Sequence, residues 1–506
     1  MAAAPKSFFA SQGEQFRKAE ALEKIDDTEL TPEEPYRSKY AARKIYEEIL
    51  ANLKAEEEKA AEVAAAAAVE GAVAAAAITT EDGPPLDTER LLACRMATLL
   101  HLGINAYETE EVSDGERHLR QCLSLVGDFK EKLMHPKFVT HYIHACNHTG
   151  IVWNLRKDFE KSLEYFTLAK KVFVEYTCSK NDDEESGWRA PDALTTCFND
   201  EEFETQSRTG SDIDVLEVKL RQEFESLHTH TLYFLAQSYE RLGEKEKSAA
   251  CCHETLWRQL QKENTELDVC DWSRNAAILS QYYVGTGEMK TARHCLAAAT
   301  VMFGKMEFKT EEEDKEEQRD RTGAEIKRCW SAFALSLLRY SREADAKDNH
   351  GDRDPDVDDE LLERLHLNAA AVDVASGGRL SFLRDGRLDA AKVADQEEKI
   401  GCELAPNFDE ARTVFLFGTN CLEDAKSYFS KDSHCSDYVS ILQSHSQFYK
   451  MLADFEPDVA RKCKMHKRRI DMLAEILKVG RCPYFGWFSE LIIMYDNVKM
   501  GGRFRF

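Results

Sequence analysis

Four segments of this chain can be laid over one another, and this internal repeat restricts the fold more than any other feature. Each has a small residue, a second small residue twelve positions later, a bulky residue four positions on, and a small or medium one three further. The matching positions are Gly103, Gly115, Leu119 and Cys122; Gly150, Ser162, Phe166 and Ala169; Ala236, Ser248, Cys252 (a weak match to the bulky position) and Thr255; Ser280, Ala292, Leu296 and Ala299. An aromatic follows the first small residue by three positions in three segments, as Trp153, Tyr239 and Tyr283.

This spacing is typical of tetratricopeptide-like helical hairpins. Small residues lie where the two helices of a hairpin cross closely, and aromatic residues fill the space between neighbouring hairpins. Gly243 and Gly287 stand where the first helices of two hairpins are expected to end. These glycines are 44 residues apart, whereas the usual period is about 34 residues. Longer helices or longer connections are therefore expected.

The predicted fold class is all-α, a right-handed α-solenoid of tetratricopeptide-like hairpins, with a non-repeating helical bundle as the alternative. Apolar residues recur at helical spacing, and no convincing run of alternating strands is found. Charged segments at 179–214, 310–320 and 344–359 are expected to be surface loops or disordered. The expected divisions are an N-terminal segment at 1–33, a helix plus Ala/Glu-rich linker at 34–80, N-terminal repeats at 81–309, a charged loop with linker helices at 310–400, C-terminal helical repeats at 401–479 and a divergent tail at 480–506.

Charge and composition exclude several classes of function. The chain has 67 Lys and Arg against 92 Asp and Glu, a net charge of -25. This disfavours a nucleic-acid binder, which needs a basic face, and favours a basic partner.

The 15 cysteines are an odd number without a disulfide-scaffold spacing, and no secretory segment follows the start, so a cytoplasmic protein with reduced thiols is expected. The Ala-rich tract at 63–78 is weakly apolar, which predicts a linker or loose helix and no membrane insertion.

Several distinctive strings occur in order along most of the chain, from about Glu34 to about Glu475. They are Glu34-Pro-Tyr-Arg-Ser-Lys-Tyr40, His230-Thr-Leu-Tyr-Phe-Leu-Ala-Gln-Ser-Tyr239, Asn275-Ala-Ala-Ile-Leu-Ser-Gln-Tyr-Tyr283, Ala292-Arg-His-Cys-Leu-Ala-Ala-Ala299 and Cys463-Lys-Met-His-Lys-Arg-Arg-Ile470. None is a chemical signature. Together they resemble the kinesin-binding protein family, also called KIF-binding protein.

The resemblance implies an α-solenoid that grips the motor domain of certain kinesins and keeps the motor off microtubules. It further implies a cytoplasmic, cytoskeleton-associated regulator of microtubule-based transport, with roles in axons and neuronal development and with other cytoskeletal proteins as further candidate partners. Family members continue beyond the Cys463–Ile470 string with more helical repeats, whereas this chain departs near Ile476. A real short form and a truncated reading frame are both compatible with that departure. Which kinesins are bound, and the oligomeric state, are not indicated.

In such repeats the first helix of each hairpin lines the concave surface. The residues that flank the packing positions in the third and fourth repeats are therefore the candidate partner-binding set. They are Tyr233, Phe234, Gln237, Glu240, Gln259, Arg274, Ile278, Gln281 and Tyr282. Aromatic anchors dominate many protein interfaces, and a buried glutamine would need hydrogen-bond partners. The alternative is that Phe234 and Ile278 belong to the core.

Other clusters have plainer explanations. The basic cluster Arg461, Lys462, Lys464, Lys467, Arg468 and Arg469 is predicted to be a helix face salt-bridged to carboxylates, with a nuclear signal or a patch for an acidic partner as alternatives. Cys251 to His253, and Cys463 with His466, lack the second pair that a structural zinc site needs. No catalytic motif, cofactor motif or metal site is predicted.

Two other functions fit the sequence less well than a kinesin regulator. A co-chaperone adaptor would line its groove with Lys and Arg to hold an acidic C-terminal peptide, whereas these two repeats offer mainly Gln, Glu and aromatic residues. An enzyme built on a solenoid would need a pocket that gathers His with acidic residues, and the 15 histidines are scattered.

Overall fold

The protein is described by a computed structural model that covers residues 7–27, 34–69, 87–127, 133–178, 190–199, 211–261, 267–305, 313–349, 361, 382–383 and 387–479. Within these residues it has fifteen α-helices, one 3-10 helix and no strand. The all-α prediction is confirmed, and the handedness of the solenoid stays a prediction. The helices divide into two compact units, Met1–Thr255 and Leu256–Phe506, and the tail at 480–506 lies outside the described residues.

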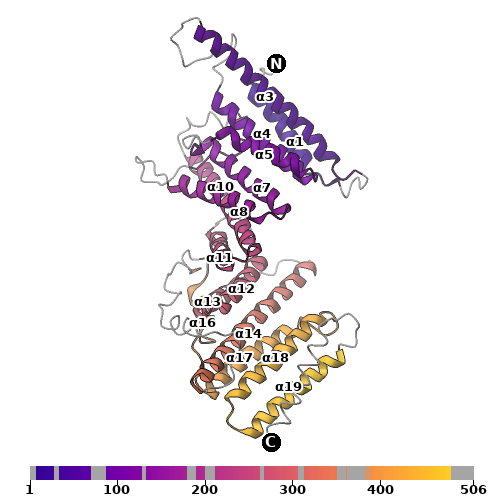
Figure 1. Cartoon of the computed structure of the whole chain (residues 1–506), viewed down its shortest axis with the longest axis vertical. Coiled ribbons are helices and arrows are strands. Elements are labelled where there is room, and N and C mark those ends of the chain that lie inside the picture. The colour runs from indigo at the N-terminus through magenta and orange to yellow at the C-terminus, as the bar shows by residue number, and fades with distance from the viewer. Residues whose placement is uncertain are drawn as a thin grey trace. The chain divides into compact units, whose positions relative to one another are not determined.

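The first unit is a series of packed helix pairs (Figure 1). Its helices are α1 (Phe8–Glu23), α3 (Arg37–Val69), α4 (Thr88–Glu108), α5 (Val112–Val126), α7 (Pro136–Leu155), α8 (Phe159–Cys178), α10 (Ser211–Arg241) and the larger part of α11 (Lys245–Gln261), with the 3-10 helix η1 at Thr196–Phe198. The pairs are α1 with α3, α4 with α5, and α7 with α8, and α10 packs on α8.

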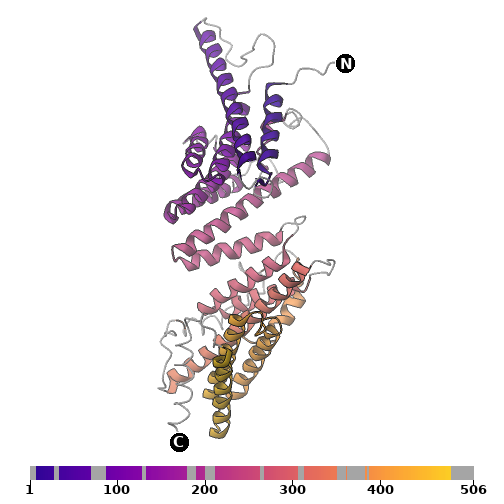
Figure 2. The ribbon, with the colours of Figure 1, turned by 90° about the vertical axis from the view of Figure 1, so that its right-hand side faces the viewer.

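The second unit begins within α11 and continues the pairing with one change of order (Figure 2). Its helices are α12 (Val269–Gly285), α13 (Met289–Phe303), α14 (Glu313–Asn349), α16 (Ala390–Glu397), α17 (Phe408–Lys426), α18 (Cys435–Phe455) and α19 (Val459–Val479). Helix α12 pairs with α13 and α18 with α19, but α14 pairs with α17, and the intervening α16 packs on α13.

The small residues of the repeat lie where paired helices touch, as predicted. A Cβ added to Gly103 would come within 2.6 Å of Leu119, and one added to Gly150 would come within 2.6 Å of Phe166. The Ser162 hydroxyl donates to the carbonyl of Gly150 at 2.9 Å, across the twelve-residue spacing. Ser248 makes the same bond to the carbonyl of Ala236 at 2.9 Å. The repeat in the sequence is therefore a repeat of close helix crossings.

All four hairpins turn through the same backbone conformation, seven residues after the first small residue. The residue there has positive φ: 69° at Glu110, 62° at Lys157, 78° at Gly243 and 79° at Gly287. In each turn the next N–H bonds the carbonyl five residues back, as in Glu244 to Tyr239 at 2.9 Å, which is the Schellman way of ending a helix. Two of the four turns thus use a left-handed conformation without glycine, which costs roughly 1–2 kcal/mol each.

Parts of the segments expected to be loops are helical or buried. Helix α14 covers 313–349 and α10 begins at Ser211, so the helices extend into these charged stretches from the segments beside them. Residues 190–199 turn back into the first unit, where Phe198 stacks on Phe16 with ring centroids 4.6 Å apart. The expectation of surface loops is wrong at these positions, and the loose-helix alternative holds for the Ala-rich tract up to Val69.

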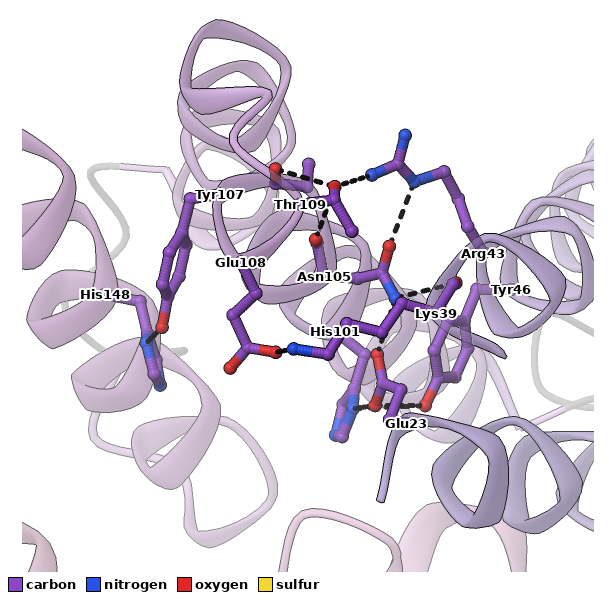
Figure 3. Close-up of polar contacts among 11 residues, drawn as sticks. Glu23, Lys39, Arg43, Tyr46, His101, Asn105, Tyr107, Glu108, Thr109 and His148 are labelled. Carbon is purple, nitrogen blue, oxygen red and sulfur yellow. Dashed lines mark hydrogen bonds and ion pairs between the residues drawn. The ribbon is translucent and has the colours of Figure 1, made fainter. Parts of the chain in front are cut away.

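A buried polar network fastens the N-terminal helices to the first repeat (Figure 3). The fully buried Asn105 side chain donates to Glu23 at 3.1 Å and to the Lys39 carbonyl at 3.0 Å, and accepts from Arg43 at 3.0 Å. Tyr46 donates to the same Glu23 carboxylate at 2.9 Å, and its burial raises the pKa of the phenol above its ordinary value. Every polar group of Asn105 is therefore paired across three helices, as a buried amide requires.

The two turns without glycine give a test of backbone strain. Lys157→Gly should raise the melting temperature, by an amount that corresponds to about 1 kcal/mol, because glycine adopts positive φ without a steric cost. Gly243→Ala should lower it by a similar amount, since an added Cβ there meets no atom within 4 Å and the cost is backbone strain alone. Thermal unfolding followed by circular dichroism measures both. A Lys157→Gly protein that melts below the parent would contradict the assignment.

One half-buried histidine, His148, makes the first unit sensitive to acid. Burial lowers the pKa of His148 to about 4, with His101 and His230 adding to the effect, whereas a histidine in the unfolded chain titrates near about 6.5. The unfolded chain therefore binds this proton first as pH falls, and stability is lost between about pH 6.5 and pH 4. His148→Gln keeps an acceptor for the Tyr107 hydroxyl, which lies 3.0 Å from Nδ1 in the parent. Between pH 7.5 and pH 5 we expect the free energy of unfolding of this variant to fall by roughly 2 kcal/mol less than that of the parent.

Urea unfolding at the two pH values measures this difference. Equal losses in the parent and in His148→Gln would show that His148 does not titrate in this way.

Candidate partner-binding surface

Helix α10 presents part of the predicted partner-binding set on an exposed stripe. Tyr233 is 52% exposed, and Gln237 and Glu240 are also exposed, one and two helical turns further along. The helix is fixed behind them by buried contacts, because Thr231 and Asn147 exchange side-chain hydrogen bonds at 2.9 and 3.1 Å. An aromatic ring, an amide and a carboxylate thus stand on a rigid support, which suits contact with another protein.

Phe234 is the member of the set that turns toward the core. Its ring stacks on Phe166 of α8 with centroids 5.2 Å apart, and it packs against a small buried cluster that includes Leu232 and Cys251. It also meets the ring of Tyr233 edge-on at 5.6 Å. Phe234 therefore packs between Phe166 and Tyr233 and holds the Tyr233 ring in place. This agrees with the alternative that Phe234 belongs to the core.

Helix α12, in the second unit, presents a second stripe. Ile278 is 58% exposed, so the core alternative does not apply to it. Tyr282 is half-buried one turn further on, beside the buried Tyr283 at 5.4 Å. Gln259, at the end of α11, is also half-buried. An exposed aliphatic side chain next to a half-buried tyrosine is a small apolar patch on an otherwise polar helix face.

Two predicted residues of α12 are held by α14. Arg274 forms an ion pair with Glu325 at 2.9 Å and donates to the Thr322 hydroxyl at 3.1 Å. Gln281 donates to the carbonyl of Cys329 at 3.3 Å. These side chains border the exposed stripe and fix the spacing of α12 and α14. Whether any of the nine residues contacts a partner stays a prediction.

The strings that carry the family resemblance mostly join helices together. In the first string Lys39 pairs with Glu108 at 2.9 Å, and Tyr36 donates to Glu110 at 3.1 Å, so α3 is fastened to the first hairpin turn. In the fourth string His294 donates to Glu397 of α16 at 2.8 Å and accepts from the N–H of Phe382 at 3.2 Å. Sequence reasoning identified the strings but had no signal for these contacts, because the partners lie far along the chain.

The basic cluster is not a salt-bridged face. In the part of the chain that the structure describes, its one ion pair joins Arg461 to Glu456 at 3.7 Å. Arg468 donates instead to the Tyr449 hydroxyl at 2.8 Å, and Arg469 lies 3.2 Å from a His466 ring nitrogen. The prediction of a face neutralised by carboxylates is wrong, because Arg468 and Arg469 are paired with a tyrosine hydroxyl and a histidine ring and not with carboxylates.

Most of the cysteines in the described part of the chain are buried. Burial raises the pKa of Cys122 to about 12 and that of Cys251 to about 11, so these thiols stay protonated at neutral pH. Among the described residues, no group of three or more His, Cys, Asp or Glu side chains could hold a metal ion. Within the same residues, no helix is long and apolar enough to cross a membrane.

Comparisons with known proteins point to one kind of relative. Residues 270–486 match the family model described as KIF-1 binding protein C terminal. The chain is 37% identical over 494 residues to the KIF-binding protein of Danio rerio, covering 93% of this chain and 73% of that protein. It is 33% identical over 483 residues to the Homo sapiens KIF-binding protein, covering 93% and 73%. For the Drosophila melanogaster protein the identity is 31% over 485 residues, covering 94% and 71%.

The free energy of unfolding can distinguish the roles of the adjacent residues Tyr233 and Phe234. Phe234→Ala should lower the free energy of unfolding by about 2–4 kcal/mol, because it removes a ring packed on Phe166. Tyr233→Ala should change it by less than about 0.5 kcal/mol, because that ring is half exposed. Urea unfolding measures both. If Tyr233→Ala destabilises as much as Phe234→Ala, Tyr233 is a core residue and leaves the candidate surface.

Proposed function

Since this chain belongs to the KIF-binding protein family, we propose that it binds kinesin motor domains and blocks their attachment to microtubules. The alignment over 93% of the chain with the Danio rerio protein, which is named for binding a KIF, carries the proposal. The family is one of binding proteins, so the chain is a binding protein and not an enzyme. In the proposed role it competes with the microtubule for the motor.

The charge of the chain supports this competition. A motor surface that meets acidic tubulin must be basic, and this chain has a net charge of -25. Complementary charge accelerates encounter and excludes wrongly charged partners. An acidic scaffold can therefore occupy the same motor face that tubulin would occupy, and its affinity should fall with added salt.

The exposed stripes of α10 and α12 are the proposed contact residues. Tyr233 and Ile278 are the most exposed apolar members, at 52% and 58%, and an apolar side chain that loses water on binding contributes most of an interface's affinity. Gln237 and Glu240 would add polar contacts beside Tyr233 in the first unit, and Gln259 and Tyr282 would add theirs in the second unit, to which Ile278 belongs. Phe234, Arg274 and Gln281 would hold the stripes in place through the contacts described above.

In a cell, the proposed activity would make the protein a cytoplasmic regulator of microtubule-based transport. A motor held off its track carries no cargo, so the amount of free motor would depend on the amount of this protein. Roles in axons and in neuronal development belong to the same proposal, as does association with the cytoskeleton.

Microtubule co-pelleting tests the proposal. Purified full-length chain is added at micromolar excess to a panel of kinesin motor domains with stabilised microtubules, and motor is measured in pellet and supernatant. We expect some motors to move into the supernatant. Tyr233→Ala combined with Ile278→Ala should weaken this release by about 10–100-fold in the concentration needed, whereas Leu155→Ala, at a comparable 57% exposure, should leave it unchanged.

Three outcomes count against the proposal or part of it. If no motor leaves the pellet and none binds the protein, the proposed function is wrong for this chain. If motors bind the protein and still pellet, binding stands and the competition with microtubules fails. If Leu155→Ala weakens release as much as the double variant, the stripes are not the contact surface.

A further inference from the structure

A groove lies among α17, α18 and α19 of the second unit, the three helices that run side by side near the end of the described chain (Figure 1). It has a volume of about 690 Å³ and draws its lining from all three helices. None of the residues predicted for the partner surface lines it. The groove therefore needs an explanation separate from the proposed kinesin contact.

The floor of the groove is apolar and aromatic. Phe415 of α17 meets Tyr449 of α18 edge-on, with ring centroids 5.0 Å apart. Beside them Leu416 is 44% exposed, and Met465 of α19 also lines the groove. A leucine left open to water in the same groove as two aromatic rings can bind an apolar side chain, because covering it removes further apolar surface from water.

The walls of the groove are basic. Arg412, Lys464 and Lys467 line it and are exposed, and none of them forms an ion pair within the residues that the structure describes. Arg468 adds a fourth cation, which lies over the Tyr449 ring at 5.6 Å. The chain as a whole has a net charge of -25. This group of cations without ion pairs around an apolar floor therefore makes the groove basic on an otherwise acidic protein.

Three carboxylates in the same groove restrict which anion fits. Asp409 and Asp471 are exposed, and Glu456 is nearly fully buried next to Arg461. They would repel the continuous phosphate charge of a nucleic acid, which binds best to uninterrupted basic surface. A peptide can instead space its carboxylates to meet Arg412 and the α19 lysines and avoid these acidic positions.

We propose that this groove binds an acidic peptide segment of a partner protein, with an apolar side chain on Leu416 and carboxylates on Arg412, Lys464 and Lys467. Arginine suits this role because its planar guanidinium can hold a carboxylate with two parallel hydrogen bonds. The apolar floor supplies an anchor and the cations select the charge. The surface goes beyond the proposed kinesin contact, which calls for a basic partner.

Fluorescence anisotropy with the full-length chain tests the groove. The probe is a fluorescein-labelled sixteen-residue peptide that carries a leucine or tyrosine at every fourth position and single glutamates separated from one another by serine, and its charge-reversed control replaces each glutamate with lysine. We expect saturable, salt-sensitive binding of the acidic peptide alone. Arg412→Glu with Lys464→Glu should raise the Kd at least about 10-fold, and Leu416→Asp should raise it similarly.

A matched variant outside the groove makes the result specific. Lys450→Glu reverses an exposed charge on α18 that does not line the groove, so it should leave the Kd within about twofold. Equal loss in Lys450→Glu, absence of peptide binding, or competition by a poly-thymidine oligonucleotide at the same concentration would each overturn the proposal. Kinesin co-pelleting with the Arg412→Glu, Lys464→Glu protein should match the parent, and a loss there would show that the groove belongs to the kinesin contact instead.

Discussion

Where Ser162 donates to the Gly150 carbonyl at 2.9 Å, two helix backbones meet with almost no side chain between them. This contact requires a residue without a bulky side chain at both positions, and it fixes the axial register of one helix on the other. Once the register is set, the turn between the helices must reverse the chain within a few residues. The positive φ at Lys157 and at its three counterparts follows from that requirement. The close crossing therefore determines the turn, and it also determines which side of each helix is left exposed.

The same crossing explains how much the sequence could predict. Gly103, Gly150, Ala236 and Ser280 lie twelve residues from their partners, so both members of each contact fall in one short stretch of sequence. The pattern is local, and all four hairpins are found as expected. Tyr233 and Ile278 were both predicted to lie on the partner surface, and both are exposed, although for Ile278 the sequence left the core alternative open. Phe234 is different, because only the place of Phe166 on another hairpin shows that its ring is covered.

Contacts between distant parts of the chain were beyond prediction. Asn105 joins Glu23 and Arg43, and no spacing rule connects these three residues. Phe198 lies in a stretch that reads as polar loop, yet it stacks on Phe16 at 4.6 Å because η1 closes the side of α1 that would otherwise expose apolar rings. Conversely, the cluster at 461–469 reads as a surface neutralised by acids, yet Arg468 contacts the hydroxyl and the ring of Tyr449 of α18 instead. Local pattern gives helices and hairpins, whereas the identity of the neighbouring helix needs the three-dimensional structure.

The pairing of α14 with α17 also affects the order in which the helix pairs can form during synthesis. Pairs such as α4 with α5 are adjacent in sequence, so each can fold soon after it leaves the ribosome. Helix α14 ends at Asn349 and its partner begins at Phe408. One side of α14 can pack at once on the earlier helices α12 and α13, whereas the side that packs on α17 stays uncovered until that later helix has been made. Closing a longer segment costs only about 0.6 kcal/mol for each doubling of its length, so the delay is kinetic far more than thermodynamic. During synthesis, the side of α14 that awaits α17 is transiently exposed apolar surface, which is the kind of surface that chaperones protect from aggregation.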